Sequence, residues 1–379
     1  MPEAVLVSAL RTPIGTAGRG TLRDTTAFDL ADHVVRAAAE GLDPEQVDDV
    51  ILAEGLYGGG VIARHAAITA GLTTVPGLAL NRHCAAGLGA VATAAGSIRA
   101  GMDELIIAGG VNSASTSPRS KIRAGEEWVD WMSPTHPDRP DAPNRDMSIT
   151  VGWNSALKAG VTREDMDAWA LRSHQYAIRA IDEGRFKEEI VPIQTPHGMF
   201  EVDEHPRRDT SMEKLAKLKV LHPEIEGFSI TAGNACGAND GAAALVVASD
   251  RLGLPALAYV RSWASVGIDP KYTGLAPVQA IPKALKRAGL TIDQVGLFEI
   301  NEAFAAQAVA NIRLLELDPE KVNVSGSGCS LGHPVAATGA RMLVTLVHEL
   351  RRRGGGIGVA AMCAGGGMGS AAVIEVPAP

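Results

Sequence analysis

One pattern occurs twice in this chain, and it limits the folds that the chain can adopt. In residues 78–101 a short apolar run, LALNRHC, leads through small residues into a long helical segment that ends at a glycine, AAGLGAVATAAGSIRAG. In residues 322–354 the run VNVSGSGCSLGHP leads in the same way into VAATGARMLVTLVHELRRRG. A strand, a small-residue turn and a glycine-terminated helix, used twice, predict an internal duplication. Two unrelated α/β domains would produce a similar alternation, so the pattern alone leaves that alternative open.

Strands and helices alternate around each copy of the pattern. Near the N-terminus the β-branched runs AVLVSAL, VDDVILAEG and ELIIAGGV predict strands, and AFDLADHVVRAAAEGL has apolar residues at helical spacing. The series resumes near residue 256 with ALAYVRSWASVG, VQAIPKALKRAGL and GLFEINEAFA, and it ends in GGIGVAAMC. This alternation predicts an α/β chain in two halves, residues 1–114, completed by about 240–255, and residues 256–379.

Between these halves, residues 115–239 lose the regular alternation. They contain a Pro- and His-rich stretch, SPTHPDRPDAPNRD, a helical segment, TREDMDAWALRSHQYAIRAIDEGRF, and a polar stretch that includes PRRDTSMEKLAKLKVL. Long insertions inside compact folds are usually functional. We therefore expect residues 115–239 to form an inserted loop domain that covers a site.

Composition and charge exclude several classes of protein. The chain has 379 residues, of which 46% are apolar and 21% charged, a balance typical of globular proteins of more than one packed unit. Its 42 glycines favour close packing of helices on sheets. A net charge of -8 with scattered Lys and Arg argues against nucleic-acid binding. No targeting segment and no run of about 20 uncharged apolar residues occurs, which predicts a cytoplasmic protein that does not enter membranes.

The cysteines need separate explanations, because four of them in so long a chain cannot form a disulfide framework. No cysteine or histidine pair has zinc-ligand spacing, so we expect no metal. Cys84 comes directly before a predicted helix, whose dipole favours a thiolate nucleophile. Burial as a small apolar residue is the alternative for this cysteine.

Three other residues lie at predicted strand ends or helix starts, namely His333, Cys363 and Asn301. Such ends face one crevice in α/β folds, so these residues could converge with Cys84. Taken singly, each has a structural alternative. His333 precedes a proline, and Asn301 could cap a helix that begins at Glu302.

Taken together, several stretches resemble the thiolase family. They are NRHCAAGLGAV at 81–91, TAGNACGANDGAAA at 231–244, INEAF at 300–304, VNVSGSGCSLGHPVAATGAR at 322–341 and MCAGGGMG at 362–369, with RTPIG near the start. The resemblance implies a duplicated five-layer αβαβα architecture, with two mixed sheets packed through a shared central helix layer. It also implies an acyltransferase that cleaves a 3-oxoacyl-CoA with CoA, or condenses acetyl-CoA in the reverse direction, in a homodimer or homotetramer.

The resemblance also implies catalytic roles. Cys84 would form an acyl-enzyme in a ping-pong reaction, His333 would take the thiol proton with a pKa near neutrality, and Cys363 would be the second acid/base. One oxyanion hole would use His333 with a water held by Asn301. The other would use the backbone N–H groups of Cys84 and Gly365.

The insertion would bind coenzyme A as a co-substrate, and no bound cofactor is expected. Cations in PRRDTSMEKLAKLK are candidates for its phosphates, although a solvated charged helix would look the same. The residues expected to contact coenzyme A are Met147, Arg208, Lys217, Ala232, Cys236, Ala303 and Phe304, with Arg207, Lys214 and Lys219 as further cations.

Some positions depart from the usual pattern of the family. Cys236 and Ala86 stand where serine is usual, and Ala336 stands where glycine is usual. In addition, SGSGCS replaces the common GGAIA, and DMSITVGW lacks a usual glutamate. These departures leave the acyl substrate open. Cys363 argues against a decarboxylating condensing enzyme, which would carry histidine there, and the complete catalytic set argues against a non-catalytic acyl-CoA-binding protein.

Overall fold

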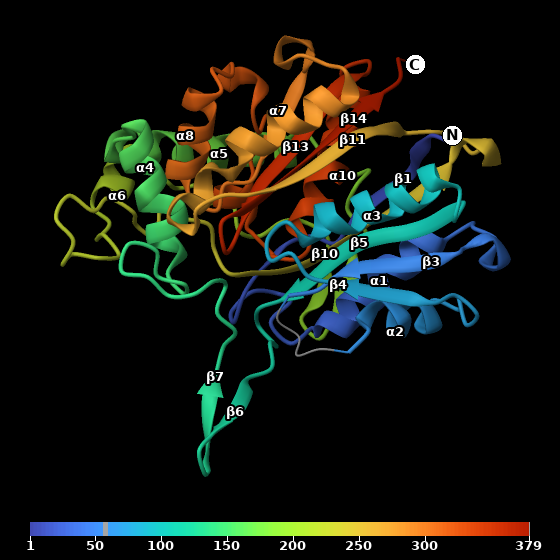
Figure 1. Cartoon of the computed structure of the whole chain (residues 1–379), viewed down its shortest axis with the longest axis horizontal. Coiled ribbons are helices and arrows are strands. Elements are labelled where there is room, and N and C mark those ends of the chain that lie inside the picture. Colours follow the sequence, from blue (N-terminus) through green and yellow to red (C-terminus); the bar gives the residue numbers. More distant parts are fainter. Residues whose placement is uncertain (56–59, 379) are drawn as a thin grey trace.

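The computed structural model describes residues 1–55 and 60–378 (Figure 1). The helices are α1 (Ala27–Ala39), α2 (Ile62–Thr69), α3 (Ala86–Ala100), α4 (Asn154–Ala159), α5 (Arg163–Asp182), α6 (Met212–Ala216), α7 (Ala276–Ala288), α8 (Ala305–Leu314), α9 (Gly328–Leu331) and α10 (Thr338–Arg352). The strands are β1 (Ala4–Arg11), β2 (Gly15–Thr16), β3 (Asp49–Ala53), β4 (Gly77–Leu80), β5 (Leu105–Ser113), β6 (Ser120–Ala124), β7 (Glu127–Trp131), β8 (Ile193–Thr195), β9 (Gly198–Phe200), β10 (Asn239–Ser249), β11 (Ala258–Gly267), β12 (Leu297–Ile300), β13 (Gly356–Ala364) and β14 (Met368–Val376).

The two halves of the chain use the same strand order. The N-terminal half has the order β4-β3-β5-β10-β1, with parallel pairing of β3 to β4 and β5 and antiparallel pairing of β10 to β5 and β1. The C-terminal half has the order β12-β13-β14-β11 with the corresponding directions. A single parallel bridge between Phe298 and Val322 stands where β4 stands in the first half. The matching order confirms the predicted duplication.

Helices form three layers around the two half-sheets. Helices α1 and α2 cover one outer face, α7 and α8 cover the other, and α3 and α10 lie between the half-sheets. Along β10, Leu245 and Val247 pack into the central layer while Val246 packs into an outer one, as the alternation of side chains along a strand requires. This is the five-layer order that the resemblance implies. The half-sheets are also joined by β1 and β11, which pair over two residues, so their hydrogen bonding is continuous.

The two central helices touch backbone to backbone. A Cβ at Gly87 of α3 would lie 2.6 Å from the backbone nitrogen of Ala340, and a Cβ at Gly339 of α10 would lie 2.4 Å from that of Leu88. Only glycine fits at such a separation. This contact brings together the N-terminal ends of α3 and α10, which are the ends that follow Cys84 and His333.

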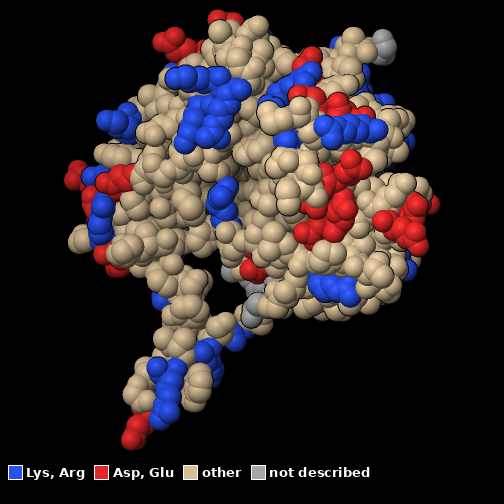
Figure 2. Space-filling view, turned by 45° about the vertical axis from the view of Figure 1, so that its right-hand side comes forward, with Lys and Arg blue, Asp and Glu red and all other residues tan. Residues whose placement is uncertain are grey.

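Residues 115–239 leave the sheet after β5 and return to it as β10. The predicted long helix is α5, which begins with a capping box between Thr162 and Asp165. The short helix α6 lies in the stretch that we predicted as a polar loop. Strands β6 and β7 form a hairpin that stands clear of the body (Figures 1 and 2) and exposes Trp128 and Trp131.

The surface carries no single dominant charge on the face drawn in Figure 2, where acidic and basic side chains are interspersed. This agrees with the dispersed Lys and Arg of the sequence. In the part of the chain that the structure describes, no helix combines the length and the apolar character needed to cross a membrane.

Candidate active site

A tight turn between β4 and α3 positions Cys84. His83 has a φ of 46°, in the left-handed region that is unfavourable for a residue with a Cβ, and its backbone N–H donates to Asn81 Oδ1 at 2.7 Å. Helix α3 then begins at Ala86 without a side-chain cap. Holding a non-glycine residue in this region costs about 1–3 kcal/mol, and it persists only where the surrounding structure fixes it. The turn therefore holds the Cys84 side chain in a defined position.

Three thiols lie together at this turn. The backbone N–H of Gly365, in the turn between β13 and β14, hydrogen-bonds to the Cys84 sulfur. Burial, and then negative charge on Cys84, raise the pKa of Cys236 to about 12. The same two causes raise the pKa of Cys363 well above its usual value. Because these charge interactions act at short range, the structure brings Cys84, Cys236 and Cys363 into one cluster.

The expectation that the helix dipole makes Cys84 a thiolate is wrong in this structure. Burial raises the pKa of Cys84 to about 11, against the opposing effect of hydrogen bonds from the backbone of Gly365 and of Cys84 itself. Cys84 precedes the first residue of α3, so it stands outside the first helical turn, while the low-dielectric surroundings disfavour the charged form. The thiol is neutral near pH 7 and needs a base to become a nucleophile.

His333 is held by contacts on three sides. Its backbone N–H donates to Asn239 Oδ1 at 3.0 Å, and its ring atoms Nδ1 and Nε2 lie 2.7 Å from Thr338 Oγ1 and 3.4 Å from Asn301 Nδ2. Gly332 precedes it with a φ of +100°, and a Cβ there would lie 2.5 Å from the Asn239 side chain. The side chain is 5% exposed.

The hydrogen bond to Thr338 fixes the tautomer of His333. The Thr338 hydroxyl donates its single hydrogen to the carbonyl oxygen of Pro334 at 2.9 Å, so it can only accept at Nδ1 of His333. The imidazole proton therefore sits on Nδ1. The lone pair of the ring is on Nε2, which has only the long 3.4 Å contact with Asn301 Nδ2.

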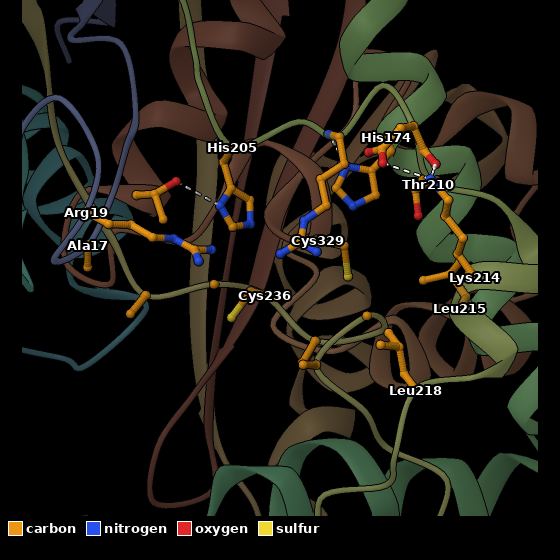
Figure 3. A pocket seen from close by; sticks show the side chains of 18 residues that line it. Ala17, Arg19, His174, His205, Thr210, Lys214, Leu215, Leu218, Cys236 and Cys329 are labelled. Carbon is orange, nitrogen blue, oxygen red and sulfur yellow. Dashed lines mark hydrogen bonds and ion pairs between the residues drawn. The ribbon is translucent and has the colours of Figure 1, made fainter.

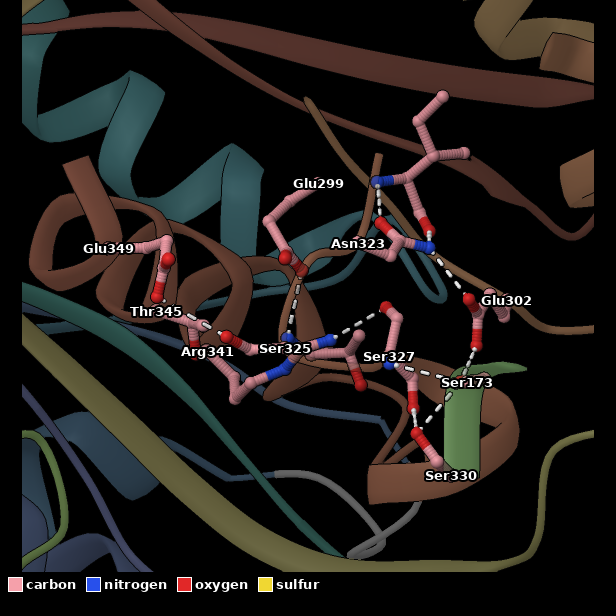
Figure 4. Close-up of polar contacts among 12 residues, drawn as sticks. Ser173, Glu299, Glu302, Asn323, Ser325, Ser327, Ser330, Arg341, Thr345 and Glu349 are labelled. Carbon is pink, nitrogen blue, oxygen red and sulfur yellow. Dashed lines mark hydrogen bonds and ion pairs between the residues drawn. The ribbon is translucent and has the colours of Figure 1, made fainter. Parts of the chain in front are cut away.

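The predicted near-neutral pKa of His333 is wrong. Burial, and then the positive charge of Arg341, lower it to about 3. Arg341 is fixed nearby by Glu299 Oε2 at 3.1 Å and by Ser327 Oγ at 3.2 Å (Figure 4). Burial raises the pKa of Glu299 to about 8. His333 is thus a neutral imidazole through the physiological pH range.

Asn301 follows β12 and does not cap a helix, because α8 begins only at Ala305. Its backbone N–H donates to the carbonyl oxygen of Ala361, its own carbonyl accepts from Gln307 Nε2, and the side chain is fully buried. Among the described residues, Asn301 Oδ1 has no hydrogen-bond partner. Asn301 therefore faces His333 with a polar atom still available.

The neighbouring Glu302 is a structural carboxylate. Its Oε1 accepts from Asn323 Nδ2 at 2.8 Å, and its Oε2 accepts from Ser173 Oγ at 2.6 Å (Figure 4). Oε1 also accepts from Trp169 Nε1 at 2.9 Å, and Oε2 from the Cys329 backbone N–H at 3.1 Å. Both of its oxygens are thus engaged by groups of the fold. It ties α5 to the turn that carries Asn301.

A cavity of about 530 Å³ opens beside the cluster (Figure 3). Of the residues predicted to contact coenzyme A, Ala232 and Cys236 line it, and so do the cations Arg207 and Lys214. Figure 3 shows Cys236 and Cys329 in the middle of the cavity, with Arg19 at one end and Leu215 and Leu218 toward the other.

The other predicted contacts lie outside this lining. Arg208 lines an adjoining hollow, where its guanidinium binds Asp182, and Lys217 and Lys219 are exposed. Ala303 and Phe304 are buried and face the segment of Cys236, whose backbone N–H donates to the Ala303 carbonyl oxygen.

Two further observations bear on ligands and on Met147. Met147 packs against the apolar cluster that contains Cys363, Ala303 and Phe304. Over residues 1–55 and 60–378, no group of three or more His, Cys, Asp or Glu side chains is placed to hold a metal ion.

Known proteins identify the family. The family models "Thiolase, N-terminal domain" and "Thiolase, C-terminal domain" match residues 4–251 and 254–376. The chain belongs to the thiolase family. An acetyl-CoA acetyltransferase of Pseudomonas aeruginosa is 45% identical over 98% of this chain and 98% of its own, and a 3-ketoacyl-CoA thiolase of Bacillus subtilis is 40% identical over 99% and 100%. The crystal structure of the Bacillus anthracis acetyl-CoA acetyltransferase has a TM-score of 0.92 and 41% identity, covering 99% of each chain. As a thiolase, the protein is an acyltransferase that exchanges acyl groups between a 3-oxoacyl-CoA and CoA.

Several residues around the site of this thiolase were not found from the sequence. They are Thr338, Asn239, Arg19, His174 and His205. Thr338 lies in the first turn of α10, five residues after His333, and a hydroxyl at that place could have been recognised as a partner for the ring. The others come from separate segments that only the fold brings together. Alanine at position 336, where the family usually has glycine, causes no backbone strain, because the φ of Ala336 is not positive.

Proposed function

We propose that this thiolase cleaves 3-oxoacyl-CoA substrates, or forms them in reverse, through a Cys84 acyl-enzyme. The observation that carries the proposal is the grouping of Cys84, Cys363 and the Gly365 N–H beside a cavity, with a neutral His333 whose Nε2 carries the ring's lone pair. An acyl-enzyme divides the exchange into two easier steps and makes the kinetics ping-pong.

In the first step His333 takes the Cys84 proton through Nε2 as the sulfur attacks the carbonyl carbon. Both groups are neutral beforehand and become an ion pair of opposite charges, which stabilise each other in a buried site. The new Nε2–H then donates to the developing oxyanion, together with a water at Asn301 Oδ1. At the second carbonyl group of the substrate, the backbone N–H groups of Gly365 and Cys84 stabilise the oxyanion.

Cys363 is the acid/base at the α-carbon of acetyl-CoA, which leaves as the C2–C3 bond breaks when the acyl-enzyme forms in the cleavage direction. It lies next to Cys84, and it protonates the departing acetyl-CoA enolate during cleavage or removes the α-proton during synthesis. Its raised pKa keeps the thiol protonated, which suits the cleavage direction.

Coenzyme A occupies the cavity as a co-substrate, and no bound cofactor takes part. The pantetheine arm of coenzyme A passes Leu215, Leu218 and Ala232, and Lys214 lies at the same end of the cavity. Met147 and Phe304 line the region of the thioester. Residues 115–239 form the loop domain that covers this site, between the α/β halves 1–114 and 256–379. We propose the cytoplasm as its location.

The assembly is a homodimer or homotetramer. Strand β4 ends the sheet and pairs on one side with β3, and it exposes Leu78 at 42%. The unpaired backbone N–H and C=O groups of an edge strand, beside an exposed leucine, suit pairing with a second copy.

Cleavage of acetoacetyl-CoA and of a longer 3-oxoacyl-CoA by CoA tests the reaction. Loss of the 3-oxoacyl thioester absorbance should require Cys84 and should fall below detection in Cys84→Ala. Incubation with acetyl-CoA should add one acetyl group to the peptide that contains Cys84, as read by mass spectrometry. A folded wild-type protein that cleaves neither substrate would contradict the proposal, and the ratio of the two rates reports the preferred chain length.

A further inference from the structure

One buried arginine joins three elements that carry residues of the site. Arg341 lies on α10 and is 1% exposed, and a cation buried to that degree is destabilising unless it is paired. Its Nη1 donates to Glu299 Oε2 at 3.1 Å, and its Nη2 donates to Ser327 Oγ at 3.2 Å (Figure 4). The two partners belong to different segments, so this single side chain connects α10 to both of them.

The contact with Glu299 connects Arg341 to the strand that leads to Asn301. Along β12, Leu297 packs into the central layer and Ile300 packs into an outer one, so Glu299 faces the central layer and α10. Asn301 follows β12 directly, two residues after Glu299. The ion pair therefore fixes the end of β12 against α10.

The contact with Ser327 connects Arg341 to the turn that carries His333. Ser327 comes directly before α9, and His333 comes shortly after this helix ends. The first residue of α9 lies against Asn301, because a Cβ at Gly328 would be 2.9 Å from Asn301 Oδ1. The start of α9 thus borders the Asn301 amide, while its end leads to His333.

Arg341 also lies on the face of α10 that holds the imidazole. Thr338 and Arg341 are three residues apart in this helix, which places them on one face. Thr338 Oγ1 is 2.7 Å from Nδ1 of His333, and Asn301 Nδ2 is 3.4 Å from its Nε2. The contacts of Arg341 therefore join the supports of the Asn301 side chain and of the His333 ring into one unit.

The ion pair is an inefficient source of stability. Burial raises the pKa of Glu299 to about 8, although the charge of Arg341 opposes this effect. Among the described residues, Arg341 Nε has no hydrogen-bond partner. Apolar side chains of similar volume often stabilise such a place as well or better. The pair is therefore expected to contribute geometry more than stability.

We propose that Arg341 is a positioning residue, which acts through Glu299 and Ser327 to hold the Asn301 amide and the His333 ring at one substrate oxygen. This rests on the function proposed above, in which a water at Asn301 Oδ1 and the Nε2–H of His333 stabilise the same oxyanion. Two donors for one oxygen must keep their separation as the charge develops. Arg341 is not itself one of these donors.

Two buried serines of one segment test the proposal. Ser327→Ala removes the oxygen that accepts from Arg341, whereas Ser325→Ala removes an equally buried hydroxyl that donates to Glu349 at 3.3 Å. The assay is cleavage by CoA of acetoacetyl-CoA, or of the longer 3-oxoacyl-CoA if that is cleaved faster.

We expect Ser327→Ala to lower kcat about tenfold, which is part of the roughly 100- to 1000-fold that loss of an oxyanion donor costs. The KM for CoA should stay within about twofold, because the variant leaves the coenzyme A cavity unchanged. Ser325→Ala should stay within about twofold in both constants. Equal losses in the two serine variants, or an unchanged kcat in Ser327→Ala, would overturn the proposal.

Arg341→Lys tests whether the arginine acts through Ser327. Lysine keeps the charge but lacks the planar fork that reaches two partners at once, so kcat should fall at least as far as in Ser327→Ala. The double variant Arg341→Lys/Ser327→Ala should then lose no more than Arg341→Lys alone. Losses that multiply would show that the two residues act independently, which would contradict the proposal.

Alkylation of Cys84 by iodoacetamide separates positioning from a general loosening of the site. This reaction needs the Cys84 thiol and its base but creates no oxyanion at Asn301 and His333. Its rate should therefore stay within about twofold in Ser327→Ala while kcat falls. A parallel loss of alkylation would assign the effect to the thiol and overturn the positioning role. A folded wild type that cleaves neither substrate would instead contradict the thiolytic function, and the proposal with it.

Discussion

At the scale of single residues, the hydrogen bond between His333 and Thr338 should control the rate. Thr338→Val keeps the shape of the side chain but removes the acceptor for Nδ1–H, so the proton can move to Nε2 and block the base. Groups that orient a functional histidine contribute about 10- to 100-fold. We expect kcat to fall by that amount with little change in KM.

Thr338→Ser is the matched control for this variant, because it keeps the hydroxyl and should retain most of the activity. Steady-state kinetics of both variants give the comparison. Equal rates in Thr338→Val and the wild type would refute the role of the hydroxyl, whereas a fall in both variants would indicate a packing effect.

The pH dependence follows from the same histidine. Its pKa is lowered from 6.5 to about 3, so the neutral base is present above that value and is lost only when the pH falls through it. We therefore expect kcat/KM to show no loss near pH 6.5, where an unperturbed histidine would titrate. A pH profile measured in buffers of constant ionic strength checks this, and an acid limb near pH 6.5 in the wild type would count against it.

The placement of the candidate site residues in the fold could be predicted from the sequence, but their ionisation could not. Cys84, Asn301, His333 and Cys363 stand at the ends of recognisable strands or the starts of helices, and a fold of this class brings such ends together. The pKa of Cys84 depends instead on how many distant side chains exclude water from it. The lining of the cavity could not be predicted either, since Arg19 and His174 lie far apart in the sequence and only the fold brings them together.

At the scale of elements, the contact between α3 and α10 should tolerate no side chain. Gly87→Ala would push a Cβ to 2.6 Å from the backbone nitrogen of Ala340, and helix backbone cannot move aside cheaply. We expect a loss of about 1–3 kcal/mol in the free energy of unfolding, with reduced activity because the turns before both helices shift.

Gly96→Ala, in the same helix, is the control. Its Cβ would meet only Trp263 at 3.5 Å, an ordinary contact, and alanine favours helix over glycine by about 1 kcal/mol. Denaturant unfolding should therefore show a neutral or stabilising effect there. Similar losses at both positions would mean that the close contact does not account for the effect.

Element boundaries could be predicted where local chemistry marks them. Helix α5 is specified by its own sequence, through the capping box between Thr162 and Asp165 and the spacing of its apolar residues. The run that begins at Val322 was predicted as a strand but is reduced to one bridge, because the next residue, Asn323, has a φ of 52° and interrupts the extended backbone. Helix α6 was missed, since five residues carry too little periodicity to distinguish a helix from a loop.

At the scale of the whole molecule, buried histidines should make the fold sensitive to acid. Burial lowers the pKa of His174 and His205 to about 4 and that of His333 to about 3, from 6.5. Between about pH 4 and 6.5 the unfolded chain binds protons that the folded chain does not, so stability falls as the pH falls. Glu299, whose pKa burial raises, acts in the opposite direction with a single proton.

The expected loss between pH 6.5 and 5 is on the order of a few kcal/mol, because each such histidine contributes up to about 1.4 kcal/mol per pH unit. Thermal melting across this range measures it. His174→Gln keeps an acceptor for the Arg207 N–H. It should reduce the dependence of the free energy of unfolding on pH by the contribution of one proton. A melting temperature independent of pH in this window would show that these side chains are protonated in the folded state.

The repeated strand order makes Cys84 and His333 counterparts. Each stands at the turn that leads into the central helix of its own half, and the two helices meet through Gly87 and Gly339. A pair of identical halves would carry the same side chain at both turns, and a site with two nucleophiles or two bases could not transfer an acyl group. The active site therefore depends on broken symmetry. In the function that we propose, divergence of two equivalent positions within one covalent chain makes one the attacker and the other its proton acceptor.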